Sequence, residues 1–246
     1  MEKNGSGNQN SKKQNLKKLV VLTGAGISAE SGLRTFRDSD GLWEEHNVMD
    51  VASIEGWYRD PKLVTEFYNA RRRQLGDVKP NRAHIVLAEL EKDFDVRIVT
   101  QNVDDLHERA GSTQVIHLHG ELTKIRSTRD ESKIIDIGYG DLTPGRTDET
   151  GAPMRPHIVW FGEAVPLIAE ADRLVREADL FAVIGTSLVV YPAAGLVGSL
   201  RPDVPAFLVD PGDVEMRLPS NFTVIKEKAG TGVEKMREKL AAYMVR

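Results

Sequence analysis

Short apolar runs alternate with segments of helical periodicity along most of the chain. The runs predicted to be buried strands are 19–22, 96–99, 115–118, 158–161, 180–184 and 206–209. Apolar residues at helical spacing cover 81–92 and 166–178, which lie between such runs. This alternation is typical of a parallel sheet with helices on both faces. The pattern therefore predicts an α/β fold, a Rossmann-like doubly wound parallel sheet.

Two stretches interrupt the alternation. A polar and aromatic helical region covers about 41–76, and a region rich in Gly, Thr, Asp and Pro covers about 121–153. We expect both to form one small inserted subdomain, while the Rossmann-like core takes about 16–40, 77–120 and 154–246. An insertion beside such a sheet makes a cleft, and ligands usually bind in clefts of this kind.

Composition and charge predict a soluble globular protein. Of the 246 residues, 40% are hydrophobic and 28% are charged. The formal net charge of −4 gives no electrostatic reason to expect a nucleic-acid partner, and no apolar run reaches the length of a membrane span. Residues 1–15 are polar and lack the apolar centre of a secretory signal, so they predict a disordered arm before a single domain at 16–246. We expect a monomeric, cytoplasmic protein with no nucleic-acid or membrane partner.

Closely spaced glycines follow the first apolar run, in the segment Thr23-Gly24-Ala25-Gly26-Ile27-Ser28. Gly24 permits a tight turn, Gly26 lets the backbone approach pyrophosphate oxygens, and Ser28 can donate from the first turn of a following helix. The layout favours a dinucleotide phosphate site. Glycine-rich turns between a strand and a helix also occur without any ligand, and that alternative stays open from this motif alone.

Amide and carboxylate side chains follow the run at 96–99. Gln101, Asn102 and Asp104 come directly after it, and the carboxyl edge of a parallel sheet is where ligands bind. The alternative interpretation is that Asn102 or Asp104 caps the next helix. The sequence thus places three candidate ligand-binding side chains at one strand end.

Two histidines alternate along the next predicted strand. His117 and His119 point to the same face, and an imidazole there can act as a general base near neutral pH. The alternative is a hydrogen-bonded, half-buried histidine. Metal binding by the pair lacks a third ligand at suitable spacing.

Two further segments place small residues after apolar runs. In Phe161-Gly162-Glu163, the glycine leaves backbone groups near the sheet edge, where an extended peptide can add as a strand. Gly185-Thr186-Ser187 puts small hydroxyl donors where phosphate or ribose would lie. Each segment taken separately is also consistent with a loop that caps the next helix.

Together these segments resemble the sirtuin family of NAD-dependent protein deacylases in order, spacing and content, over nearly the whole chain from about residue 19. The matching motifs are Gly24-Ala25-Gly26-Ile27-Ser28, Phe36-Arg37, Thr100-Gln101-Asn102-Val103-Asp104, His119-Gly120, Phe161-Gly162-Glu163 and Gly185-Thr186-Ser187. The resemblance implies lysine deacylation with NAD as the cofactor. In the mechanism that the resemblance implies, the acyl oxygen attacks the nicotinamide ribose, and nicotinamide and an O-acyl-ADP-ribose are released.

The resemblance also implies site residues. Those that would bind NAD are Gly24, Ala25, Gly26, Ser28, Phe36, Arg37, Gln101, Asn102, Asp104, Gly185, Thr186, Ser187, Asp210, Gly230 and Thr231. Asp210 stands where the family commonly has Asn. His119 would be the general base, with Asn102 and Asp104 also in the catalytic set, while His117 takes a structural role. Val159, Phe161 and Gly162 would bind the substrate peptide of an acylated protein.

Tyr68 and Arg71 match the Tyr-x-x-Arg pair of the sirtuin branch that removes succinyl, malonyl and glutaryl groups. They are three residues apart and so share one helix face. Arg presents a planar fork that binds a carboxylate, and Tyr adds a hydroxyl donor. The resemblance implies both deacetylation and desuccinylation. Taken without it, Arg71 could instead belong to a solvated run of arginines at 71–73.

The chain has no cysteine, whereas most sirtuins bind a structural zinc ion through two Cys-x-x-Cys pairs. Ser127 and the neighbourhood of Thr147 occupy the expected ligand region. The absence of cysteine excludes disulfides, thiolate catalysis and a cysteine-built zinc site. We therefore expect no zinc, and we expect the region 121–153 to be held by packing of Ile134, Ile135, Ile137 and Tyr139 on the helical module.

Three other functions compete with deacylation. A dehydrogenase would fit the glycine motif, but it needs an acidic residue that closes a second strand about 20 residues later. Glu44 and Glu45 are near that distance without an apolar strand before them. The others are a non-catalytic NAD or ADP-ribose binding module and a protein ADP-ribosyltransferase.

Overall fold

A six-stranded parallel sheet forms the larger part of the computed structural model, which describes residues 16–33, 42–43, 46–213 and 217–244. The strand order is β11-β10-β9-β1-β4-β5, and every neighbouring pair is parallel. The strands are β1 (Lys18–Thr23), β4 (Asp95–Thr100), β5 (Val115–His117), β9 (Leu180–Ile184), β10 (Ala206–Val209) and β11 (Phe222–Ile225). The predicted α/β, doubly wound sheet is confirmed.

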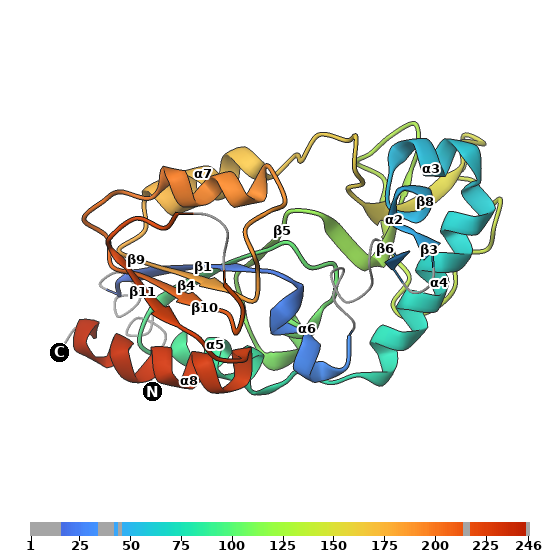
Figure 1. Ribbon diagram of the computed structural model, residues 1–246. Helices are drawn as coiled ribbons and strands as arrows, with labels where there is room; N and C mark the ends of the chain where they lie inside the picture. Colours follow the sequence, from blue (N-terminus) through green and yellow to red (C-terminus); the bar gives the residue numbers. More distant parts are fainter. Residues whose placement is uncertain (1–15, 34–41, 44–45, 214–216, 245–246) are drawn as a thin grey trace, which may run out of the picture.

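Helices cover both faces of this sheet (Figure 1). Helices α5 (Arg82–Leu90) and α8 (Ala229–Leu240) lie on one face, and α7 (Ile168–Arg176) lies on the other. Leu19 and Val21 of β1 pack in the first layer, whereas Val20 and Leu22 pack in the second. Successive strand residues face opposite sides, so a strand buried on both faces has a continuous apolar sequence. The continuous apolar runs therefore predicted these strands from the sequence.

Shorter elements complete this part of the fold. They are the helix α6 (Leu106–Ala110) and the 3₁₀ turns η1 (Ala25–Ile27), η2 (Ala29–Ser31), η3 (Ala193–Ser199) and η4 (Ala241–Tyr243). None of the helices in the described ranges is long and apolar enough to cross a membrane.

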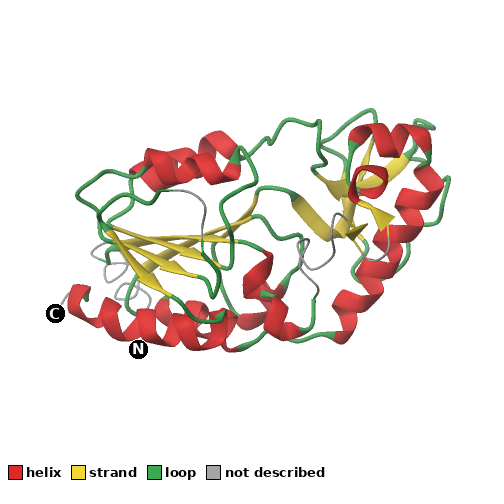
Figure 2. Cartoon of the chain, viewed as in Figure 1, coloured by secondary structure: helices red, strands yellow, loops and turns green. Residues whose placement is uncertain are grey.

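A smaller module lies at one end of the sheet (Figure 2). Its helices are α2 (Val48–Val51), α3 (Ile54–Arg59) and α4 (Pro61–Asp77). Its strands are the hairpin β2 (Leu42–Trp43) and β3 (His46–Asn47), and the antiparallel sheet β7-β6-β8, formed by β6 (Gly120–Ser127), β7 (Ile134–Asp136) and β8 (Met154–Ile158). Helix α4 begins where Asp60 accepts a hydrogen bond from the Leu63 N–H at 2.9 Å.

One predicted strand lies in the other sheet. The sequence predicted a buried strand at 158–161 in the parallel sheet, but β8 ends at Ile158 and pairs with β6 in the antiparallel sheet of the small module. Ile158 and Trp160 pack with α4 residues there. An apolar run shows that a segment is buried and does not show against which layer. The predicted arm at 1–15 lies outside the described residues, and the predicted domain boundaries stay a prediction.

Candidate active site

The loops after β1, β4 and β9 meet at one edge of the parallel sheet. The Gly26 N–H donates to the Gly185 carbonyl at 2.8 Å, and the Gln101 N–H donates to the Thr23 carbonyl at 2.9 Å. Gln101 Nε2 also lies 3.4 Å from Thr186 Oγ1. β1 pairs with β4 on one side and with β9 on the other, so the sheet is built outward from β1 in two opposite directions. Ligands of open α/β sheets bind at such a point.

Glycines let these loops approach closely. A Cβ on Gly26 would lie 2.8 Å from the Gly185 Cα, and a Cβ on Gly24 would lie 2.6 Å from the Thr186 Cβ. Gly185 has a φ of +64°, which favours glycine. The helix predicted after Gly24 is wrong, because the N–H groups of Ile27 and Ser28 bond three residues back and form the 3₁₀ turn that contains Ala25.

Ser28, Asn102 and Asp104 form a buried hydrogen-bonded group. Ser28 Oγ donates to Asp104 Oδ2 at 2.9 Å, and Asn102 Nδ2 donates to Ser28 Oγ at 3.2 Å and to the Gly24 carbonyl at 3.1 Å. Burial raises the pKa of Asp104, and the hydrogen bonds from Ser28 and the Leu106 N–H offset that effect only in part. The Leu106 bond also ties Asp104 to the first residue of α6, whose N-cap is Asp105.

His119 carries its proton on a defined nitrogen. Its Nδ1 lies 2.9 Å from the Gln101 carbonyl, and a carbonyl can only accept, so Nδ1 is the donor. The neutral ring therefore presents an unprotonated Nε2. Burial lowers the pKa of His119, and the bond to Gln101 opposes this effect. At neutral pH the ring is a neutral imidazole, the form that can accept a proton.

His117 has both ring nitrogens engaged. Nδ1 bonds the Asn102 carbonyl at 3.0 Å, and Nε2 bonds Glu108 Oε1 at 2.8 Å. Burial lowers the pKa of His117, but the hydrogen bond and charge of Glu108, together with the Asn102 carbonyl and the charge of Glu121, raise it, and the net shift is upward. These contacts support the structural role predicted for His117. In the part of the chain that the structure describes, no group of three or more His, Cys, Asp or Glu residues could hold a metal ion.

The remaining cofactor candidates lie at the ends of β9 and β10 and at the start of α8. Ser187 Oγ is buried and lacks a hydrogen-bond partner among the described residues, so it can serve a ligand. Asp210 Oδ1 accepts the Gly212 N–H at 2.9 Å. Gly230, followed by Thr231, donates its N–H to Glu30 in η2 at 2.7 Å. The glycine contacts and the orphaned hydroxyl fit a dinucleotide. Phe36 and Arg37 lie outside the described residues.

Tyr68 and Arg71 lie on α4, as predicted, in different surroundings. Arg71 lines a pocket of about 360 Å³ together with His46, Leu63, Glu66, Phe67, Ala70 and Gln74. Tyr68 is buried beside it, and its Oη accepts a hydrogen bond from Trp160 Nε1 at 2.9 Å. The alternative of a solvated arginine run at 71–73 is wrong, because Arg72 is fully buried and Arg71 nearly so.

The segment 159–162 runs beside His119. The Val159 N–H donates to the His119 carbonyl at 2.9 Å, and the Phe161 N–H donates to the Ala52 carbonyl at 2.9 Å. Gly162 has a φ of +89°, and its Cβ would lie 2.9 Å from the Ile54 side chain. These backbone donors are already engaged within the chain, so a bound peptide would have to pair with other groups of this segment or of its neighbours.

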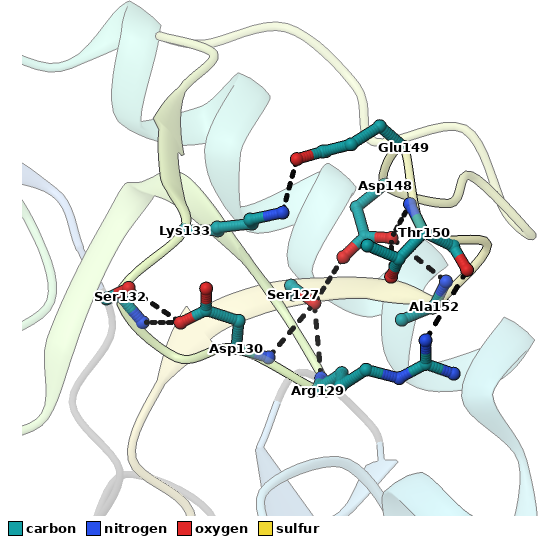
Figure 3. A network of polar contacts seen from close by, with 9 residues as sticks. All are labelled: Ser127, Arg129, Asp130, Ser132, Lys133, Asp148, Glu149, Thr150 and Ala152. Carbon is teal, nitrogen blue, oxygen red and sulfur yellow. Dashed lines mark hydrogen bonds and ion pairs between the residues drawn. The ribbon is translucent and has the colours of Figure 1, made fainter.

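The region 121–153, where the resemblance to sirtuins implies a zinc site in most members, has a polar network. Ser127 is fully buried, and its Oγ donates to Asp148 Oδ2 at 2.7 Å and accepts the Arg129 and Asp130 N–H groups (Figure 3). Asp148 Oδ1 accepts two N–H groups and a hydroxyl from the turn at 150–152. Hydrogen bonds from Thr150 and Ser127 hold the pKa of Asp148 well below its usual value. A hydroxyl already bonded in this way, with no thiolate in the chain, does not fit such a zinc site.

The expected apolar packing of this region is largely wrong. Ile134 and Ile135 are 44% and 41% exposed, and Ile137 is the member packed on the small cluster around Ile125. Tyr139 does lie against α4 at Gly76. Two polar side chains of α4 also make buried hydrogen bonds to this region.

Those two side chains are Arg72 and Asn69. Arg72 Nε donates to the Leu122 carbonyl at 2.6 Å, and Asn69 exchanges two hydrogen bonds of 2.9 Å with the backbone of Leu142. These polar bonds, together with the packing of Leu122 in the apolar cluster of α4, connect the region to the helix in place of the exposed isoleucines.

A family model, curated relatives and solved structures all match this chain. A family model described as Sir2 family matches residues 24–192. The NAD-dependent protein deacylases of Helicobacter pylori (strain ATCC 700392 / 26695) and Bacteroides thetaiotaomicron are each 52% identical, over 92% of this chain and 98% of the relative. A crystal structure of a Sir2 homolog–NAD complex has a TM-score of 0.83 at 34% identity, covering 99% of this chain and 98% of that one. A structure of Sir2 bound to acetylated peptide has a TM-score of 0.75 at 30% identity, with 93% and 95% covered. The chain belongs to the Sir2 family, the sirtuins.

Proposed function

We propose that this protein is an NAD-dependent protein deacylase that removes acetyl and succinyl- or malonyl-type groups from lysine side chains. The products are the free lysine, nicotinamide and O-acyl-ADP-ribose. Relatives named NAD-dependent protein deacylase support this, as do related structures with NAD and with acetylated peptide. The observation that carries the proposal is the neutral His119, held with Nε2 unprotonated next to the loops after β1 and β4.

Each group at the sheet edge has a role in this proposal. NAD would supply a ribose carbon that loses nicotinamide and accepts the acyl oxygen. Gly24, Gly26 and Gly185 leave room for its phosphates, and the buried Ser187 hydroxyl can donate to it. His119 Nε2 would take the proton of a ribose hydroxyl.

Tyr68 and Arg71 would recognise acyl chains that end in a carboxylate, as the Tyr-x-x-Arg pattern implies. Arg71 supplies a planar fork on the wall of the pocket. The segment with Val159, Phe161 and Gly162 would guide the peptide past His119. The monomeric state and the cytoplasmic location stay predictions.

The structure gives the dehydrogenase alternative little support. A dehydrogenase needs an acidic residue at the end of a parallel strand that follows the glycine loop. Within the described ranges, the next strand after the glycine loop is β2, which pairs with β3 in an antiparallel hairpin, and Glu44 and Glu45 lie outside these ranges. The reaction products distinguish a deacylase from a binding module and from an ADP-ribosyltransferase.

The test is mass spectrometry of acetyl- and succinyl-lysine peptides incubated with the purified protein, with and without NAD. A deacylase removes the acyl group when NAD is present, and the His119→Asn variant loses that activity. A binding module removes none, and an ADP-ribosyltransferase adds ADP-ribose to protein. Either of these outcomes would replace the proposed function.

A further inference from the structure

The hydroxyl of Tyr68 is oriented by a tryptophan that lies 92 positions further along the chain. Trp160 Nε1 donates to Tyr68 Oη at 2.9 Å, and both side chains are buried. An indole N–H can only donate, so the Tyr68 oxygen is the acceptor and its own proton points away from Trp160. Burial also raises the pKa of Tyr68, so the phenol stays protonated at physiological pH.

Trp160 is itself held rigidly. The Arg155 guanidinium lies 3.6 Å from the Trp160 ring centroid, and Arg155 pairs with Glu163 at 2.6 and 2.8 Å. Glu163 also accepts the Trp160 backbone N–H at 2.8 Å. The ring of Trp57 packs beside it, with 5.4 Å between centroids. The indole therefore reaches Tyr68 from a fixed position.

Arg71 is oriented by a residue one helical turn further along α4. Its Nη1 donates to Gln74 Oε1 at 2.8 Å, and Gln74 lines the same pocket. A neutral amide can fix the plane of a guanidinium without adding a charge of its own. The neighbouring Arg73 instead pairs with the carboxylate of Asp141 at 2.6 Å.

We propose that Trp160 and Gln74 are positioning residues that hold Tyr68 and Arg71 in the orientation needed to recognise the terminal carboxylate of a dicarboxylic acyl group. The inference rests on the proposed function and deepens it. An acetyl group has no carboxylate, so the orientation of this pair matters for succinyl-lysine and not for acetyl-lysine. Loss of either positioning contact shifts selectivity between the two substrates.

The experiment compares kcat/KM for succinyl- and acetyl-lysine peptides of one sequence. Trp160→Phe keeps an aromatic ring and removes the N–H, and Gln74→Met keeps the length and removes the acceptor. Each is expected to lower the succinyl-to-acetyl ratio about two- to twelvefold, the range of one hydrogen bond, mainly through a higher KM for succinyl peptide. The matched control is Tyr58→Phe, which removes the hydroxyl of a 76% exposed aromatic side chain in the same module, and which leaves the ratio unchanged.

The outcomes separate the inference from the proposed function. An equal loss on both substrates in the Trp160 and Gln74 variants would mean a merely structural role and overturn the inference. A wild-type protein that deacetylates and ignores succinyl-lysine would also overturn it, while the deacylase proposal stands. If wild type removes neither group, the deacylase proposal fails, and calorimetric titration with the succinyl peptide tests the positioning roles. Weaker binding by both variants, with Tyr58→Phe unchanged, supports these roles, and equal binding overturns them.

Discussion

The imidazole of His119 donates its Nδ1–H to the backbone carbonyl of Gln101 at 2.9 Å. This bond fixes the tautomer of the ring and turns the unprotonated Nε2 into the basic nitrogen. Gln101 in turn hydrogen-bonds the end of β1 through its N–H. The basic group is thus tied to the strand that ends in the glycine loop.

His119→Asn is expected to lower kcat/KM for an acyl peptide by about 10²- to 10⁴-fold, the usual contribution of a positioned general base. NAD binding is expected to persist, because the glycine loop is unchanged. Steady-state kinetics with calorimetric titration of NAD checks both statements. Since burial lowers the pKa of His119, the acid limb of the wild-type kcat/KM profile is expected below pH 6.5. A variant with near wild-type kinetics would remove His119 from the mechanism.

Gly26→Ala is expected to weaken NAD binding. The new Cβ would lie 2.8 Å from the Gly185 Cα and force the two loops apart. Overpacking of about 1–3 kcal/mol corresponds to a roughly five- to 160-fold higher Kd if the strain falls on the bound state. Calorimetric titration measures it. The control is Gly198→Ala, where a Cβ meets nothing within 4 Å, and an equal effect there would refute the steric argument.

Ser127→Ala is expected to destabilise the protein by about 1–3 kcal/mol, because two backbone N–H groups lose their acceptor in a fully buried site. Thermal unfolding reports this, at about 2–4 °C in Tm per kcal/mol. Ser132→Ala, at an exposed position of the same network, should change stability by under about 0.5 kcal/mol. A chelator is expected to leave the wild-type Tm unchanged. Stoichiometric zinc in the purified protein, with a lower Tm after chelation, would contradict the polar replacement of the metal.

Acid is expected to destabilise the protein through His84. Burial lowers the pKa of His84 in the folded state to about 4, so between pH 6.5 and 4 the unfolded chain binds a proton that the folded chain does not. The free energy of unfolding therefore decreases as the pH is lowered across that window, by about 3 kcal/mol from this residue. His84→Gln replaces the imidazole with an amide that can also accept the Asn81 N–H in the capping box of α5 and that does not titrate. Urea unfolding from pH 7 to 4.5 should show a shallower slope for the variant, and parallel slopes would exclude this role.

Much of the parallel sheet could be predicted from the sequence, because β1, β4, β9 and β10 are buried on both faces and therefore have continuous apolar sequences. β11 escaped prediction because it is a half-exposed edge strand with mixed residues. The sequence did not predict that β8 belongs to the antiparallel sheet, because an apolar run indicates burial and does not indicate which strand it pairs with.

The site shows the same division. The glycine, amide and histidine motifs lie at strand ends, so their convergence follows from the topology of a parallel sheet. Gln74 stands three positions after Arg71, and helical spacing could have identified it. The contact of Trp160 with Tyr68 joins distant parts of the chain, and no local pattern indicates it.

The most direct test of the account is the stoichiometry of the reaction in chelator-treated protein. Free nicotinamide and deacylated peptide are quantified together by chromatography and mass spectrometry, with acetyl- and succinyl-lysine peptides. The account predicts one nicotinamide and one O-acyl-ADP-ribose for each lysine freed, and no deacylation without NAD. Nicotinamide release without loss of the acyl group, or deacylation without NAD, would contradict it.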